Sequence, residues 1–265
     1  MPRSVCAAVS LADVSSANIV GYSTLTINKG YSILALNFEK TGSGELSIQD
    51  AFPFSAGMTK SNAAYAADTL MVMKDDGTYD TYFMCNGYNG KGAVSGGDGK
   101  WVNAKETVVS SATIKSGKAF WYVSKAFDDD PTSTPYTVTV AGQVLEAPTD
   151  SKDIFVGYML IGNPYPCNVP LNDGVVITKG MTKGNAAYAG DTLMIMKDDG
   201  NYDTYFMCNG YNGKGAVTGG DGKWVNVKET VVSTDSFPAN RAGWFVSATA
   251  NATVQFVNPL KGTAD

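Results

Sequence analysis

The chain contains no histidine among its 265 residues. Histidine is the commonest general base and the commonest nitrogen ligand of metals in proteins. Its absence excludes a Ser-His-Asp triad, a Cys-His dyad and any zinc site that needs an imidazole. Charged residues are also scarce, at 17%, and the net charge is −5. Because a nucleic-acid-binding surface is basic and clustered, we expect no nucleic-acid partner.

The sequence also lacks any hydrophobic run near the roughly 18 residues that a membrane-spanning helix needs. Gly, Tyr, Thr, Ser, Asn and Val are frequent instead, as is typical of secreted all-β proteins. The first 22 residues include small residues and an A-x-A-like pattern but no full apolar core of a signal peptide. This start is either the remnant of a signal peptide or the mature terminus. We expect a secreted or cell-surface protein with no membrane span.

A segment of 54 residues occurs twice, 123 positions apart. Residues 57–110 and 180–233 differ at six positions, which are Ser61/Gly184, Ala67/Gly190, Val72/Ile195, Thr78/Asn201, Ser95/Thr218 and Ala104/Val227. A repeat of this length indicates tandem domains rather than a solenoid. We predict an arm at residues 1–18, a first domain at 19–146, a linker at 147–153 and a second domain at 154–265.

Alternating and apolar runs predict strands in both domains. The first domain has such runs at residues 19–27, 31–37, 69–74, 79–85, 119–124 and 135–142; the second has them at 157–163, 193–197, 202–208, 244–246 and 253–257. Asp76-Gly77 predicts a tight hairpin. Residues 62–68 and their copy favour one or two helical turns. The glycine-rich residues 86–100 are predicted to form a long loop. The predicted fold is all-β, with two tandem β-sandwich or β-barrel domains.

Four cysteines are weakly typical of an oxidising compartment. Cys85 and Cys208 are repeat equivalents, so we expect them to have equivalent surroundings. Bridges within a domain, Cys6–Cys85 and Cys167–Cys208, need no special docking of the domains, whereas a Cys85–Cys208 bridge does. We therefore prefer Cys167–Cys208 over Cys85–Cys208 if a disulfide forms. Free buried thiols are the alternative.

Short motifs resemble those of a secreted β module that is widespread in bacteria and archaea. The module opens with G-[WY]-x-L-[IV], carries a G-K-[GA]-[FY]-W element and closes on a T-[IV]-x-[IV]-x-G strand. The matching residues here are 30–34 and 157–161 for the opening, 117–121 for the second element and 137–142 for the closing strand. The resemblance implies a β fold and a cell-surface setting, and it supplies no catalytic residues.

The second domain departs from the motif, because Asn240 stands where the first domain has Gly117. Asparagine is the residue best able to replace glycine at positive φ. We therefore expect Asn240 to adopt that conformation.

Aromatic and amide side chains recur in both copies near the glycine-rich segment. An exposed strip of such residues stacks on sugar rings or anchors a protein interface. The candidate binding residues are Tyr88, Asn89, Trp101, Tyr211, Asn212 and Trp224. We expect Tyr88 and Tyr211 to be exposed, since they lie between asparagines and glycines. Trp121 and Trp244 lie within apolar strands, so we assign them to the core.

The acidic residues predict turns rather than a catalytic pair. Asp76 and Asp80 flank a hairpin tip, whereas a glycosidase needs two carboxyl groups facing each other across a cleft. Loop oxygens of this kind are ligands that calcium accepts, so a calcium site is the alternative, but the spacing does not fit a D-x-D-x-D-G motif. We expect no catalytic residue and no cofactor.

The arm alternates apolar and small or polar residues through Val5, Ala7, Val9, Leu11 and Val14. Such a segment either packs on its own chain or adds a strand to the sheet of a neighbour. The assembly residues are therefore Val5, Val9, Leu11 and Val14. The leading hypothesis is a non-enzymatic structural protein that associates with itself, as a subunit of a filament or surface assembly. The alternative is a bivalent carbohydrate-binding protein or adhesin that uses the duplicated Tyr/Trp/Asn set to bind glycans.

Overall fold

The computed structural model describes residues 20–28, 30–42, 44–74, 76–125 and 135–261. The predicted arm at residues 1–18, with Val5, Val9, Leu11 and Val14, lies outside these residues, and so does Cys6. Within the described ranges, no helix is long and apolar enough to cross a membrane.

The first half of the chain forms three antiparallel sheets. One sheet has the order β1-β10-β3, a second has the order β2-β9-β5-β6-β7, and the third pairs β4 with β8. The strands are β1 (Val20–Ile27), β2 (Gly30–Ala35), β3 (Phe38–Glu39), β4 (Leu46–Ser47), β5 (Thr69–Met73), β6 (Tyr79–Asn89), β7 (Gly92–Asn103), β8 (Thr113–Ile114), β9 (Ala119–Ser124) and β10 (Tyr136–Val144). Two single turns of helix, α1 (Ile48–Ala51) and the 3₁₀ turn η1 (Ala64–Ala66), complete it.

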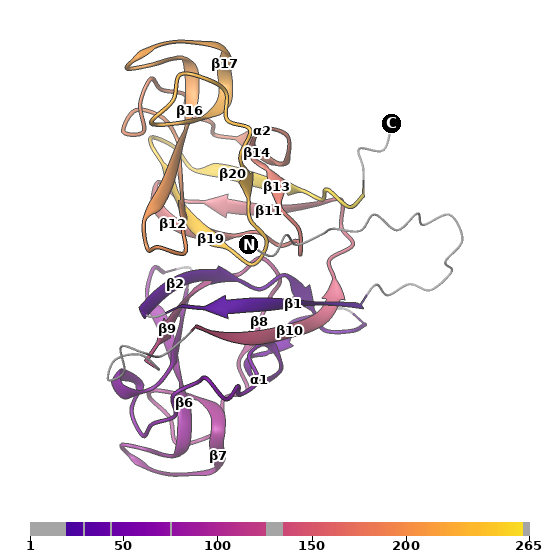
Figure 1. The fold of residues 1–265 in the computed structure, drawn as a ribbon, viewed down its shortest axis with the longest axis vertical. Helices are drawn as coiled ribbons and strands as arrows, with labels where there is room; N and C mark the ends of the chain where they lie inside the picture. The colour runs from indigo at the N-terminus through magenta and orange to yellow at the C-terminus, as the bar shows by residue number, and fades with distance from the viewer. Residues whose placement is uncertain (1–19, 29, 43, 75, 126–134, 262–265) are drawn as a thin grey trace, which may run out of the picture.

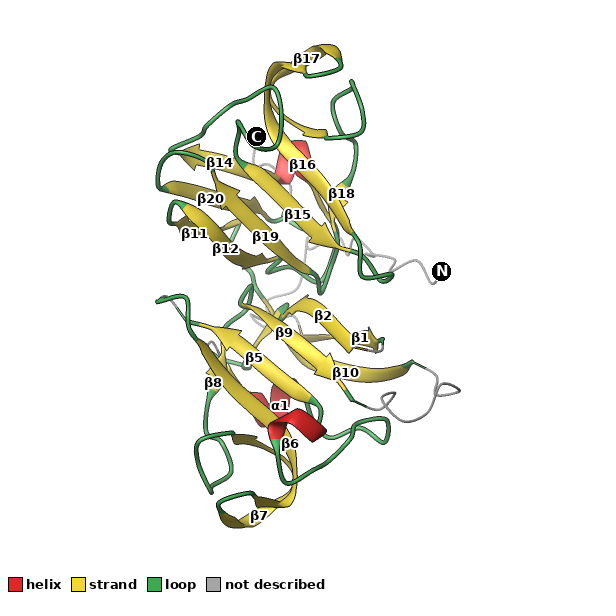
Figure 2. Ribbon diagram, turned by 90° about the vertical axis from the view of Figure 1, so that its left-hand side faces the viewer, coloured by secondary structure: helices red, strands yellow, loops and turns green. Residues whose placement is uncertain are grey.

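The second half repeats this plan with the sheet orders β11-β20-β14, β12-β19-β15-β16-β17 and β13-β18. Its elements are β11 (Thr149–Ile154), β12 (Gly157–Gly162), β13 (Val169–Pro170), α2 (Leu171–Gly174), β14 (Val175–Lys179), β15 (Thr192–Met196), β16 (Tyr202–Asn212), β17 (Gly215–Asn226), β18 (Ser236–Phe237), β19 (Ala242–Ser247) and β20 (Ala252–Val257). The prediction of an all-β fold is confirmed. Figure 2 shows the two halves as separate stacks of strands that meet in the middle of the molecule.

Each half has its own hydrophobic core between its three-stranded and five-stranded sheets. In the first half, Leu25 and Val140 from one sheet join Leu70 and Phe120 from the other. In the second half, Ile154 and Val254 meet Leu193 and Phe245. These strands follow from their alternation, since every second residue of a strand points to the same face of the sheet.

The repeated segment forms a hairpin in each half, as its Asp-Gly turn predicts. Met73 pairs with Tyr79 and Met196 with Tyr202, and Gly77 and Gly200 have φ of 79° and 80°. The prediction of a long loop at residues 86–100 is wrong. This segment continues β6 and forms most of β7, with register shifts around Asn86. Its glycines Gly87, Gly96 and Gly99 have positive φ, so they allow bulges within a strand pair rather than a loop.

The predicted linker at residues 147–153 is also mostly strand. β10 ends at Val144 and β11 begins at Thr149, so the connection between the two named strands is residues 145–148. Residues 149–153 pair with β20 of the second half. Their polar composition suggested a linker, but it suits an edge strand with one face in solvent.

The cysteine environments agree with the expected equivalence of Cys85 and Cys208 and with the alternative of free buried thiols. Cys85 and Cys208 are both buried, and each thiol donates to the carbonyl oxygen three residues later, Tyr88 or Tyr211. Both have free thiols, so neither the Cys6–Cys85 nor the Cys167–Cys208 bridge forms. Cys167 packs in the main core of its half, whereas Cys208 belongs to the small cluster that includes Phe206.

Asn240 has φ of 59° and is the one non-glycine residue with positive φ in the described ranges, as expected. We predict that Asn240→Ala lowers the free energy of unfolding by about 1 kcal/mol, because alanine adopts this conformation poorly. Asn240→Gly should lower it by less, since it removes only the hydrogen bond from Ser23. Urea denaturation of both variants measures the difference. Equal losses in the two variants would show that the Ser23 bond, not φ, governs this position.

Candidate binding surfaces and the seam between the halves

Of the predicted binding residues, only the two tyrosines reach solvent. Tyr88 and Tyr211 are 52% and 49% exposed on β6 and β16. Their equal exposure follows from the identical sequence around them. They remain candidates for contact with a ligand or another protein.

The two tryptophans and two asparagines of the predicted set are buried. Trp101 donates its indole N–H to the Phe52 carbonyl oxygen at 2.6 Å, and Trp224 donates to that of Val175 at 2.8 Å. The side-chain amides of Asn89 and Asn212 donate to the carbonyl oxygens of Glu106 and Glu229. The predicted set is therefore not one exposed strip: these four side chains secure the loops and helix turns beside the hairpin.

The most exposed aromatic residues of the repeat are ones that the sequence did not single out. Tyr65 and Tyr188 are 83% and 90% exposed. Each lies in a short turn made of small residues, which offers no apolar surface large enough to cover an aromatic ring. This composition is the sequence signal that could have predicted their exposure. The turn packs on the β6–β7 hairpin through Ala64 and Ala67.

A second loop brings an exposed valine to the same hairpin, Val108 in the first half and Val231 in the second. Val109 and Val232, the next residues, pack on the small clusters around Cys85 and Cys208. We call the exposed residues of each hairpin and its two loops the repeat surface, which consists of Tyr65, Tyr88 and Val108 or of Tyr188, Tyr211 and Val231.

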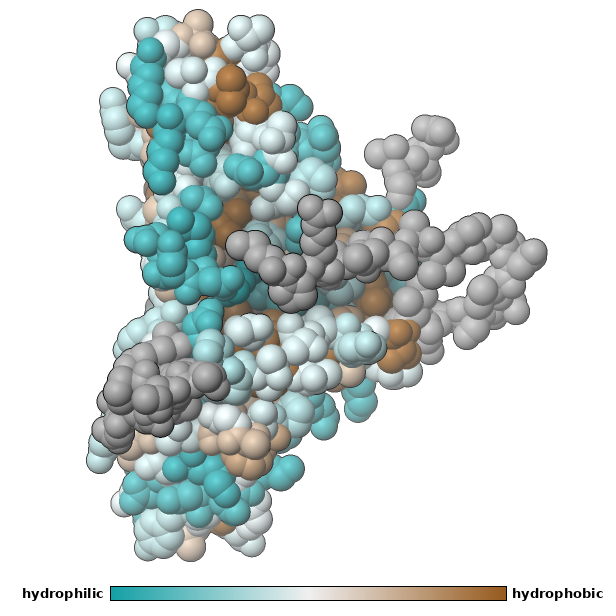
Figure 3. Space-filling view, viewed as in Figure 1, coloured by the Kyte–Doolittle hydropathy of each residue, from teal (hydrophilic) through white to brown (hydrophobic). Residues whose placement is uncertain are grey.

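The two repeated hairpins lie at opposite ends of the long axis of the molecule. β6 and β7 form one end and β16 and β17 the other (Figure 1). On the face drawn in Figure 3, hydrophobic residues reach the surface in small separate patches between hydrophilic ones. No single large apolar face is visible in that view. The feature that the two ends of the molecule share is the duplicated hairpin.

The carboxylates at the hairpin tips take part in the turns. Asp76 accepts hydrogen bonds from the backbone N–H and the hydroxyl of Thr78, and these bonds lower the pKa of Asp76. Asp199 is bound in the same way by the backbone N–H of Asn201, which lowers its pKa too. Among the residues that the structure describes, no group of three Cys, Asp or Glu side chains could hold a metal ion.

The halves meet through the outer faces of their five-stranded sheets. The buried residues of this seam are Ile33, Ala35 and Ala119 from the first half and Leu160, Met196 and Ala242 from the second. Backbone bonds also cross it, since the Ala35 N–H donates to the Asn240 carbonyl oxygen and Leu34 forms a bridge with Arg241. The Ser116 hydroxyl donates to the Pro164 carbonyl oxygen, which adds a buried polar contact.

A row of four aromatic rings crosses the seam. Trp121 and Trp244 lie with ring centroids 6.4 Å apart, and Tyr31 and Tyr158 contact them edge-on at 6.0 and 6.3 Å. Such pairs contribute about 0.5–1.5 kcal/mol each beyond burial. The assignment of Trp121 and Trp244 to the core of each domain is therefore wrong in position: they are partly buried between the halves. Because each half supplies the same Tyr and Trp, the seam is nearly two-fold symmetric.

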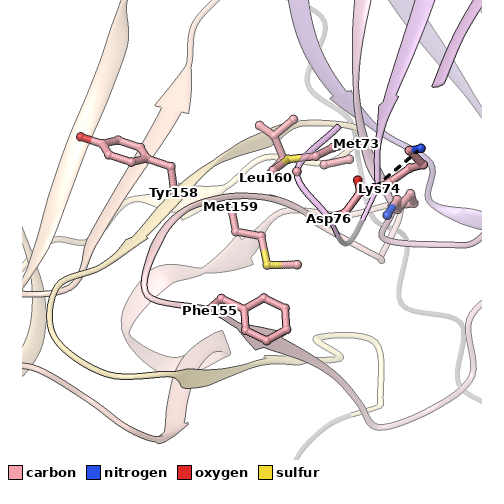
Figure 4. A pocket seen from close by; sticks show the side chains of 10 residues that line it. Met73, Lys74, Asp76, Phe155, Tyr158, Met159 and Leu160 are labelled. Carbon is pink, nitrogen blue, oxygen red and sulfur yellow. Dashed lines mark ion pairs between the residues drawn. The ribbon is translucent and has the colours of Figure 1, made fainter. Parts of the chain in front are cut away.

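An open groove of about 280 Å³ lies at one margin of the seam. Figure 4 shows its walls: Met73, Lys74 and Asp76 come from the β5–β6 turn of the first half, and Phe155, Tyr158, Met159 and Leu160 come from the second. The Lys74 ammonium lies 3.9 Å from the Asp76 carboxylate at the rim. The groove is thus apolar inside and charged along one side.

Each half also buries one carboxyl group, Asp68 or Asp191. Asp68 accepts hydrogen bonds from the hydroxyls of Tyr122 and Tyr136 and from the Lys125 backbone N–H. Within the described residues, Asp191 accepts hydrogen bonds from the backbone N–H groups of Thr182 and Ala248 alone. Burial raises the pKa of both carboxyls, and the hydrogen bonds oppose that rise. Both groups hold a loop against β9 or β19, and neither faces the groove.

No known protein family matches the chain, and no curated protein matches it either.

Proposed function

We propose that the protein is a non-enzymatic structural subunit of a secreted filament or surface assembly. The observation that carries the proposal is the fixed placement of two nearly identical repeat surfaces at opposite ends of one molecule. The seam, with its buried apolar cluster and aromatic row, holds the halves as one unit. A unit with like surfaces at both ends suits a bridging or spacing role.

Unpaired sheet edges support the added role of strand donation. Within the described residues, β1, β11 and β12 each pair with a single strand, whereas β2 also bridges to Arg241 of the second half through Leu34. A free edge is a template for a further strand. The alternating segment that contains Val5, Val9, Leu11 and Val14 has the pattern of such a strand.

Deletion of residues 1–18 tests this proposal. We expect the full chain to associate in a concentration-dependent way and the truncated chain to sediment as a monomer, because the donated strand is lost. Every described core residue lies between Leu25 and Phe256, so the truncation removes none of them. Sedimentation velocity and negative-stain microscopy measure the outcome. Association of the truncated chain equal to that of the full chain would contradict strand donation.

A bivalent carbohydrate-binding protein or adhesin is the second candidate. The exposed tyrosines of the repeat surfaces favour it, because aromatic rings stack on sugar rings and both halves present the same ones. Their placement at opposite ends suits the bridging of two glycan chains more than avid binding to one. Affinity electrophoresis in glycan-containing gels separates the two candidates: retardation that Tyr65→Ala and Tyr188→Ala together abolish supports glycan binding.

A further inference from the structure

The outer edge of β12 is free and lies beside the groove. β12 is the last strand of its sheet and pairs only with β19 in the described part of the chain. Four groove residues come from β12 or the turn before it: Phe155, Tyr158, Met159 and Leu160. A free backbone edge next to apolar pockets is the arrangement that binds an extended peptide by strand addition.

The opposite wall of the groove comes from the first half of the chain. Met73 offers apolar surface, and Lys74 and Asp76 form its charged side (Figure 4); Ala119 and Lys118 also line the groove. An added strand presents alternate residues to alternate faces. The groove therefore suits a segment with apolar residues at every second position and small or polar residues between them.

The turn before β12 is apolar, whereas the corresponding sequence before β2 is polar. Phe155 and Val156 form the turn before β12 and are 57% and 55% exposed. The corresponding positions before β2 are Asn28 and Lys29. Tyr158 and Leu160 of β12 have close counterparts in Tyr31 and Ile33 of β2, whereas Phe155 and Val156 stand where the first half has polar residues.

We infer that the β12 edge and its groove receive residues 4–19 of a second copy of the chain as an added strand. This inference rests on the proposed function and names the acceptor site that the function requires. Residues 4–19 carry one charged side chain, Asp13, and alternate through Val5, Val9 and Leu11. Head-to-tail assembly needs one donor segment and one acceptor edge in each chain. Such contacts produce a filament when they do not close into a ring.

Two half-competent chains test the inference. Phe155→Asp keeps the donor segment but charges the acceptor, and deletion of residues 1–18 keeps the acceptor but removes the donor. We expect Phe155→Asp to weaken self-association about tenfold or more, because an aspartate at a contact that becomes buried loses the hydrophobic gain of the ring. The matched control is Phe54→Asp, which charges another exposed phenylalanine, 45% exposed, outside the groove and the repeat surfaces and should associate as the unmodified chain does.

Mixing the two half-competent chains should yield a one-to-one complex in sedimentation velocity, although each alone is monomeric. Equal urea midpoints for Phe155→Asp and Phe54→Asp verify that both fold. If Phe155→Asp associates as well as the control while the truncated chain does not, strand donation stands but β12 is not the acceptor. If the truncated chain itself associates, strand donation fails and the inference fails with it. If the full chain stays monomeric, no segment of a second copy binds in the groove, and the inference is overturned.

Discussion

Replacing Trp101 with alanine is expected to lower the free energy of unfolding by about 3–5 kcal/mol. The Trp101 ring is buried in the core of the first half and contacts Tyr122 edge-on at a centroid distance of 6.2 Å. Its indole N–H also satisfies the Phe52 carbonyl oxygen, which the substitution leaves without that donor. The loss combines a cavity with a broken hydrogen bond, and urea denaturation followed by far-ultraviolet circular dichroism measures it.

Two further variants make this result specific. Trp224→Ala should cost a similar amount, because Trp224 packs on Phe245 and donates to the Val175 carbonyl oxygen in the same way. Tyr65→Ala should change the free energy of unfolding by less than about 0.5 kcal/mol, since its ring is exposed. A Trp101→Ala variant as stable as Tyr65→Ala would mean that Trp101 is a surface residue, as a sugar-binding role requires.

Asp68→Ala is expected to lower the free energy of unfolding by about 3 kcal/mol or more, because several donors lose the carboxylate that they share. These donors are the hydroxyls of Tyr122 and Tyr136 and the Lys125 backbone N–H. Asp191→Ala should cost less, since no tyrosine binds Asp191. Tyr122→Phe, which installs the residue type found at Phe245, should cost about 1 kcal/mol. Urea denaturation of the three variants ranks their losses in the free energy of unfolding.

The same carboxyl group makes stability depend on pH. Burial raises the pKa of Asp68 above its ordinary value of 3.8. The folded chain therefore binds this proton more tightly than the unfolded chain does, and the contribution of Asp68 to stability falls as pH rises from about 4 through the raised pKa. Urea midpoints between about pH 4 and pH 7 should fall less steeply in Asp68→Ala than in the unmodified chain. An identical slope would contradict the raised pKa.

Local signals were enough to predict the hairpins and most of the longer strands, but not β14 or the two-residue strands such as β3 and β13. The Asp-Gly turn, the alternation through Tyr79 and Phe83 and the apolar run at residues 119–124 each specify structure within a few residues. The glycine-rich segment was wrongly predicted to be a loop, because glycine is frequent both in loops and at the bulges of a long strand pair. The polar strand β11 looked like a linker for a similar reason: its edge position depends on β20, about 100 residues later.

The surfaces were harder to predict than the strands. Tyr88 and Tyr211 were correctly expected to be exposed, but whether a tryptophan is exposed depends on which face of a strand it occupies. That face is set for Trp101 by the bulges before it. The seam could not be predicted, because Trp121 and Trp244 are equally suited to a domain core and to an interface. The groove beside β12 exists only when the two halves pack together.

The location of the repeated residues limits wrong pairing between a strand of one half and the matching strand of the other half. Identical sequences close together in one chain favour wrong pairings during folding. Here β5, β6 and β7 pair with one another through short turns, so each copy can complete itself before the distant copy competes. The strands that close the sheets over long separations, β9 and β19, lie outside the repeated residues and differ at Phe120/Gly243 and Tyr122/Phe245. These two differences fall on strands for which an identical second copy would have been an equally good wrong partner.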